Sequence, residues 1–252
     1  MSSLEIASIV FACVFGGAMV GLFLRSVLPE HHLSVESKDV LKLGIGLIAT
    51  MCALVLGLLV SSAKGSFDRV NEELVQTAAK IILLDRVLSQ YGPEAKEVRG
   101  LLRGNVASAI DVLFSEDASL RAKFDTPATV ARGEDFQAKL RALSPQNDVQ
   151  RSLKARALEI SAEVILARWL LIAQSGSIST PLLVVLVVWL SVIFAGFGLF
   201  ANRNATVIAT LFVCALSVSA AIFMILELDS PLSGLIRVSS APLRNALAHL
   251  GQ

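Results

Sequence analysis

What this sequence has little of is charge, and the charge that it has is unevenly placed. Asp, Glu, Lys and Arg make up 17% of the 252 residues, whereas soluble domains carry roughly 25%. Four long apolar stretches, at residues 6–24, 43–63, 181–200 and 204–226, contain no Asp, Glu, Lys, Arg or His. Proton relays, voltage sensors and most ion-coupled carriers need ionisable groups inside the membrane, so this absence argues against those classes.

Cysteine, histidine and excess positive charge are also scarce. Cys13, Cys52 and Cys214 all fall inside apolar stretches, and an odd number so placed predicts neither a disulfide framework nor a metal site. The net charge of +1 gives no basic surface for nucleic acid. A Gly-rich phosphate loop, a nucleophile elbow and paired metal-ligand motifs are all missing. We therefore expect no enzyme and no cofactor.

The apolar stretches themselves are the strongest positive signal. The stretch at 43–63 reads LGIGLIATMCALVLGLLVSSA, which is 21 uncharged residues between Lys42 and Lys64. At about 1.5 Å of rise per residue, a helix of this length crosses the roughly 30 Å hydrocarbon core of a bilayer. The stretch at 6–24 lacks a preceding positive residue and a following cleavage site, which argues against a signal peptide. We predict an all-α integral membrane protein with four transmembrane helices.

The second predicted transmembrane helix continues beyond Lys64. Apolar or small residues recur at alternating spacings of four and three from Val70 to Tyr91, which is the seam of an amphipathic helix. Gly92 followed by Pro93 is typical of a helix end. The sequence therefore predicts one rod of about 50 residues, roughly 75 Å long, that leaves the membrane.

Weaker patterns predict the remaining elements. We expect a helix that ends near Phe114, a loop over 115–133, a short helix over 134–143 and a helix that opens at Ser144 and Pro145. We predict that the chain has four parts: transmembrane helices 1 and 2 (1–63), a cytoplasmic helical domain (64–178), transmembrane helices 3 and 4 (179–228) and a cytoplasmic tail (229–252).

The orientation follows from the basic residues that flank the spans. Four spans put both termini and the middle domain on one side. That side carries Lys64, Arg69, Lys80, Arg168, Arg237 and Arg244, and the opposite side carries Arg25, Lys38, Lys42 and Arg203. The excess of positive charge predicts that the first side is cytoplasmic.

One face of the second helix is small and polar along its whole length. Its members are Gly46, Thr50, Ala53, Gly57 and Ser61, and the face ends in Lys64. Small residues let helix backbones approach closely, so this face could be a packing surface. The alternative is that it lines a pore, with Lys42 and Lys64 at the two mouths. A third arrangement turns this face toward helix 1 and places a hydrophobic constriction on the other side, at Leu47, Met51, Leu54 and Leu58.

Four potential metal ligands lie around the connection before the second helix: His31, His32, Glu36 and Asp39. Adjacent histidines point apart unless the loop bends, and no second ligand pair accompanies them. The two interpretations are capping and surface residues, with Ser34 as the helix cap, or an ion site at a mouth.

The chain resembles the bacterial bestrophin-like domain family over nearly its whole length and in order. The segment DVLKLGIGLIATMCALVLGLLVSSAK carries much of this resemblance. The other segments that carry the resemblance are 32–37, 82–99, 197–207 and 226–247. The resemblance to true bestrophins is more distant and rests on the order of spans and on the acidic, Pro-containing segment from Glu227 to Pro231.

Bestrophins are pentameric anion channels whose second span lines a narrow neck, and animal members bind calcium at an acidic clasp after the fourth span. The resemblance implies that helix 2 lines a pore and that Glu227 and Asp229 occupy the clasp position, although the animal clasp is a denser acidic cluster. We expect a homo-oligomer of a bacterial inner membrane, multi-pass and with both termini cytoplasmic. Its partners would be the lipid bilayer and inorganic anions such as chloride, and it would act as a passive, anion-favouring channel. The alternative is a non-conducting scaffold or sensor in which the helix 2 rod transmits a signal.

Overall fold

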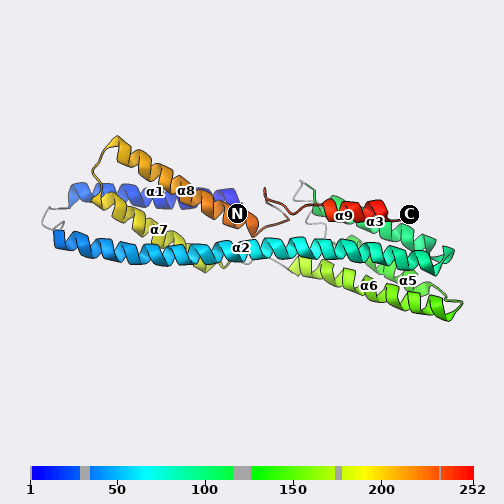
Figure 1. Ribbon diagram of the computed structural model, residues 1–252. Helices are drawn as coiled ribbons and strands as arrows, with labels where there is room; N and C mark the ends of the chain where they lie inside the picture. The colour runs from blue at the N-terminus through cyan, green and yellow to red at the C-terminus, as the bar shows by residue number, and fades with distance from the viewer. Residues whose placement is uncertain (1, 29–34, 116–125, 174–177, 233) are drawn as a thin grey trace. The chain divides into compact units, whose positions relative to one another are not determined.

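The computed structural model describes residues 2–28, 35–115, 126–173, 178–232 and 234–252 (Figure 1). In this described part the chain forms α-helices and one 3-10 turn, η2 (Pro93–Ala95), and contains no strand. The helices are α1 (Ser3–Val27), α2 (Val35–Tyr91), α3 (Lys96–Leu113), α5 (Pro127–Ala142), α6 (Asp148–Ala173), α7 (Thr180–Phe200), α8 (Ala205–Leu228) and α9 (Ala241–His249). The predicted all-α fold is confirmed.

Helix α2 is one continuous helix of 57 residues. It ends at Tyr91 because Gly92 has a φ of 127°, which an L-residue rarely adopts, and Pro93 then opens η2. Both the continuation beyond Lys64 and the stop at Gly92 agree with the prediction from sequence.

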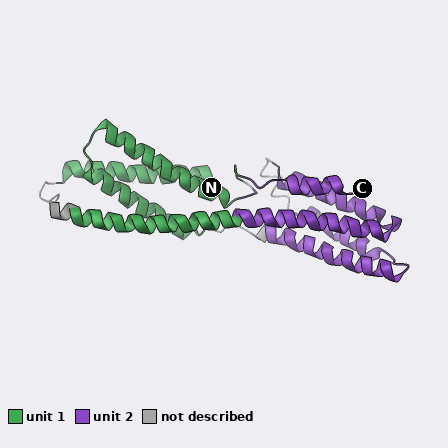
Figure 2. Cartoon of the chain, viewed as in Figure 1, with its two compact units in different colours: residues 1–66, 176–230, 234–236 green, residues 67–175, 231–233, 237–252 purple. Residues whose placement is uncertain are grey.

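The chain divides into two compact units, and α2 contributes its first part to one and its second part to the other (Figure 2). Unit 1 comprises residues 1–66, 176–230 and 234–236, and unit 2 comprises residues 67–175, 231–233 and 237–252. Unit 1 holds α1, α7, α8 and the first part of α2, whereas unit 2 holds the rest of α2 with α3, α5, α6 and α9.

In unit 1, α1 packs against α7 and α8 (Figure 1). The contact with α7 is a close approach of backbones. A methyl group on Gly17 would lie 2.7 Å from the carbonyl oxygen of Ser191, and one on Gly21 would overlap the backbone of Ala195. This close packing explains the GxxxG spacing of α1, since only glycine leaves room for the neighbouring backbone.

The same pair of helices is joined at one end by a side chain. The guanidinium of Arg25 donates a hydrogen bond to the carbonyl oxygen of Phe200 at 2.8 Å and another to the Oδ1 of Asn202 at 2.6 Å. Arg25 thereby satisfies one of the carbonyl groups that the end of α7 leaves without an intrahelical partner.

Four helices are long and apolar enough to cross a membrane: α1, the part of α2 that begins at Asp39, α7 and α8. Their most apolar 18-residue windows have mean hydropathies of 2.3 to 2.7. The prediction of four long apolar helices is confirmed, with Asn204 capping α8 through a 2.8 Å hydrogen bond from the backbone N–H of Val207.

Unit 2 is built around the amphipathic part of α2. The seam predicted from sequence is buried here, with Leu74, Leu84 and Leu88 each 1% exposed. Helices α3, α5, α6 and α9 contribute to the same hydrophobic core. The 4–3 spacing therefore reported the buried face of α2 correctly.

Two helix starts in unit 2 differ from the predictions. Helix α5 begins at Pro127, seven residues before the predicted start, because proline suits a first helical turn even where no apolar pattern marks it. Helix α6 begins at Asp148 rather than at Ser144 and Pro145. The Oδ1 of Asn147 accepts a 2.8 Å hydrogen bond from the backbone N–H of Gln150, so Asn147 supplies the cap.

Candidate functional site

The buried side of α2 in unit 1 is narrow. Its members pack into the apolar core of that unit and are Ile45, Ile48, Ala49, Cys52, Val55, Leu56, Leu59 and Ala63. Ile45 reaches the position that a side chain on Gly196 of α7 would occupy. The stripe is regular because these residues recur at helical spacings of three and four.

The small polar face of α2 is exposed. All of its predicted members are exposed: Gly46, Thr50, Ala53, Gly57 and Ser61. A methyl group on Gly46 or Gly57 would meet no atom within 4 Å. The Thr50 hydroxyl donates back to the carbonyl oxygen of Gly46 at 2.9 Å, within the same helix. This face therefore does not pack closely against helix 1 or against any other described helix of the same chain.

The neighbouring leucine face is exposed as well. Leu47, Leu54 and Leu58 are 65%, 66% and 69% exposed, and Met51 is 42% exposed. Both of the surfaces considered as pore linings are thus uncovered in the single chain. Together they form the exposed strip of α2, which is defined as these four residues and the five residues of the small polar face.

Lys42 and Lys64 flank this strip and are exposed. The Nζ of Lys42 lies 3.5 Å from the Oδ1 of Asp39, and both side chains are nearly two-thirds exposed, so this pair contributes little to stability. His31, His32 and Ser34, which formed part of the predicted ion site or cap, lie outside the described residues, as does the side chain of Glu36. Among the residues that are described, no group of three or more His, Cys, Asp or Glu is placed to hold a metal ion.

The two acids of the predicted clasp bind the chain's own backbone. Glu227 is 5% exposed and its carboxylate accepts a hydrogen bond from the backbone N–H of Leu235. The Oδ2 of Asp229 accepts one from the backbone N–H of Ile178 at 3.3 Å. Glu227 therefore holds the turn that follows α8, where a side chain on Gly234 would crowd its carboxylate, and Asp229 joins the end of α8 to the residues before α7.

Sequence reasoning missed a buried ion pair in unit 2. Asp85 of α2 is 2% exposed and accepts two hydrogen bonds from Arg99 of α3, at 2.7 and 2.8 Å, and one from the backbone N–H of Gly251 at 3.2 Å. Burial would raise the pKa of Asp85, but the hydrogen bonds from Arg99 and Gly251 and the nearby positive charge outweigh it, so the pKa is lowered. Arg103 also donates to the carbonyl oxygen of Leu250 at 3.2 Å. The ion pair therefore fastens the C-terminal segment to α2 and α3.

The sequence was compared with models of known protein families. The family model for the Bestrophin-like domain matches residues 12–243. The chain belongs to the bestrophin-like family. A comparison with curated proteins finds no match.

Solved structures support this membership at the level of the fold. A variant of a bacterial bestrophin homolog from Klebsiella pneumoniae matches with a TM-score of 0.66 and 16% identity, over 100% of this chain and 99% of that one. Another structure of a bestrophin homolog from the same organism matches with a TM-score of 0.65 and 14% identity, over 96% of each chain. A structure reported as a variant membrane protein has a TM-score of 0.65 at 15% identity, over 97% of this chain. At such low identity the similarity shows a shared fold, and this bestrophin-like chain is a membrane protein of that fold.

Proposed function

We propose that this bestrophin-like protein is a passive ion channel that favours anions, formed by several copies with α2 innermost. The observation that carries the proposal is the exposed strip of α2. It runs the length of an uncharged membrane-spanning segment and is covered by no described helix of its own chain. A ring of copies would turn these strips toward a common axis, and the family resemblance favours a ring of five.

The chemistry of the strip suits passive conduction. Hydroxyl groups, exposed backbone at glycines and apolar constrictions can line a pore without ionisable groups. Lys42 and Lys64 bracket the uncharged stretch, and a cation at each mouth raises the local concentration of anions. We place the protein in a bacterial inner membrane, with residues 64–178, the tail 229–252 and both termini in the cytoplasm.

Anion flux into liposomes tests the proposal. We expect liposomes that contain the purified, assembled protein to lose a chloride gradient faster than empty liposomes do. Lys64→Glu should lower the anion-to-cation permeability ratio, because it reverses the charge at one mouth. Lys96→Glu is the matched control, since Lys96 is exposed at the start of α3 in unit 2, away from the apolar stretch. Assembled protein without flux would contradict the channel and favour a scaffold or sensor that uses α2 as a rod.

Cysteine labelling decides which part of the strip faces the pore. In a background without Cys13, Cys52 and Cys214, Thr50→Cys reports on the small polar face and Leu54→Cys on the leucine face. A membrane-impermeant thiol reagent reaches a water-filled pore but not lipid. Modification of the position that lines the pore should reduce flux, and modification of neither would contradict a pore along α2.

A further inference from the structure

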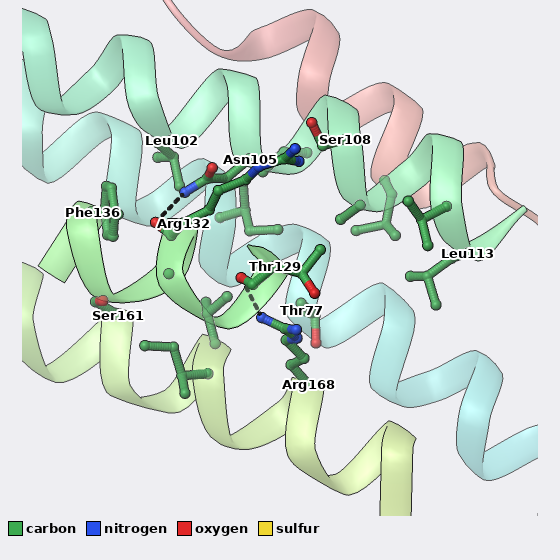
Figure 3. A pocket seen from close by; sticks show the side chains of 18 of the residues that line it. Thr77, Leu102, Asn105, Ser108, Leu113, Thr129, Arg132, Phe136, Ser161 and Arg168 are labelled. Carbon is green, nitrogen blue, oxygen red and sulfur yellow. Dashed lines mark hydrogen bonds between the residues drawn. The ribbon is translucent and has the colours of Figure 1, made fainter. Parts of the chain in front are cut away.

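A cavity of about 170 Å³ lies inside unit 2, apart from the segment that the channel proposal uses (Figure 3). Helices α2, α3, α5, α6 and α9 all contribute to its wall. Most of the lining side chains are aliphatic or aromatic, including Leu102, Phe136 and Leu171. An apolar cavity of about 150 Å³ holds a benzene molecule, so this one has room for an apolar group of about six to eight carbon atoms.

The charged side chains among the described residues of the wall are both arginines. Arg132 of α5 and Arg168 of α6 both line the cavity, and Figure 3 shows Arg132 beside Asn105 and Arg168 beside Thr129. Among the described residues that line it there is no Asp or Glu. Arg132 is exposed, so its positive charge lies at the edge of a largely apolar cavity, where charge complementarity favours an anionic ligand.

The two arginines are held in place by different contacts. The Nη1 of Arg168 donates to the carbonyl oxygen of Thr129 at 3.1 Å, and its guanidinium lies 6.0 Å from the ring centre of Trp169. The carbonyl oxygen of Arg132 accepts a 3.3 Å hydrogen bond from the Nδ2 of Asn105, which ties α5 to α3 (Figure 3). The backbone of Arg132 is thus fixed beside the cavity, while its planar guanidinium is suited to pair with a carboxylate through two hydrogen bonds.

We propose that this cavity binds a small carboxylate with an apolar body, such as a medium-chain or aromatic acid. The apolar body fills the space between Leu102, Phe136 and Leu171, and the carboxylate pairs with Arg132 at the edge of the cavity. Most ligand sites combine such an apolar wall with a few placed polar groups. The proposal concerns unit 2 and holds whether or not the protein conducts ions.

Calorimetric titration of the full-length protein in detergent tests it, with hexanoate as the probe and empty micelles as the reference. We expect saturable binding of hexanoate. Hexanamide has a chain of the same length without the charge and should bind at least tenfold more weakly, and hexylammonium should bind no more tightly than hexanamide. Equal binding of hexanoate and hexanamide, or no saturable binding of hexanoate, would overturn the proposal.

Variants separate this cavity from other sites on the protein. Arg132→Gln should weaken hexanoate binding about tenfold. Arg141→Gln should leave it unchanged, because Arg141 is exposed on the same helix but does not line the cavity. Ala109→Phe should abolish binding because Ala109 lines the cavity and the larger ring would fill it. If Ala109→Phe does not fold, the Arg132 and Arg141 pair still decides. Unchanged affinity in Arg132→Gln would show that hexanoate binds elsewhere and would overturn the proposal.

Discussion

The two units differ in how much of helix α2 they bury. In unit 2, α2 lies within a core, and its seam from Val70 to Tyr91 is buried by the surrounding helices. In unit 1, only 11% of the most apolar 18-residue window of α2 is buried, against 33% for α1 and α7 and 28% for α8. The most apolar part of the helix is therefore the least covered, which is the reverse of a water-soluble core.

The units also differ in what joins their helices. Unit 1 relies on close backbone contacts at glycines, as expected where lipid removes the hydrophobic drive between helices. Unit 2 has an apolar core and also an ion pair between the buried Asp85 and the partly exposed Arg99. The exposed apolar surface of α2 therefore marks contact with lipid, with other copies or with a pore, whereas the exposed surface of unit 2 needs no such explanation.

The largest effect in this comparison should come from Asp85→Asn. Removing one partner of a buried ion pair leaves the other charge unmatched, and this typically costs about 3 kcal/mol. Asp148→Asn is the control, because Asp148 pairs with Arg151 at the surface, where the Asp148 side chain is 91% exposed. Denaturant unfolding at fixed protein concentration should separate the two variants clearly. Equal stability would show that unit 2 does not depend on its buried pair.

A smaller loss is expected from Gly21→Ala in unit 1. The added methyl group overlaps the backbone of Ala195, so α1 and α7 must separate or shift, at a cost of about 2 kcal/mol. Gly16→Ala is the matched control on the same helix, because a methyl group there meets no atom within 4 Å. The midpoint of thermal unfolding in detergent measures both. A Gly21→Ala protein as stable as Gly16→Ala would show that the glycine contacts do not hold unit 1 together.

Acid should weaken unit 2 through Asp85. The lowered pKa means that the unfolded chain takes up a proton at a higher pH than the folded chain does. The stabilisation is fully present above the ordinary value of 3.8 and is lost as pH falls through the folded pKa. Unfolding free energy measured from pH 6 downward should fall less steeply in Asp85→Asn than in the unmodified protein. Identical slopes would contradict the assignment of this linkage to Asp85.

How far the sequence could predict this structure depends on the range over which each signal acts. The end of α2 at Gly92 was predictable because a positive φ and a proline are local properties. The start of α5 at Pro127 was missed, since no apolar period precedes Phe136. The GxxxG pair suggested close packing, but not that Ser191 and Ala195 would be its partners.

For the candidate sites, too, local features were predictable and contacts between distant segments were not. Helical spacing grouped Gly46, Thr50 and Gly57 on one face, yet spacing within one helix cannot say what covers that face. The cavity in unit 2 had no signal in the sequence at all, because five helices contribute its wall. Asp85 lay off the predicted seam, and only the return of the C-terminal segment toward α3 explains its burial.

The smallest effect should come from Asp39→Asn, at the exposed start of the apolar stretch of α2. Its pair with Lys42 is open to solvent, so the thermal midpoint should change by less than the equivalent of about 0.5 kcal/mol. In the proposed channel the variant leaves the charge of Lys42 uncompensated. We expect a slight rise in the anion-to-cation permeability ratio at low ionic strength, opposite in sign to the change in Lys64→Glu.

That rise should vanish near 1 M salt, where the screening length falls to about 3 Å. Lys42→Gln should move the permeability ratio the other way under the same conditions. A stability loss well above 1 kcal/mol in Asp39→Asn would mean that this end of α2 is buried in the assembled protein. It would then no longer be an open mouth, and the contrast between an uncovered α2 in unit 1 and a covered α2 in unit 2 would hold only for the single chain.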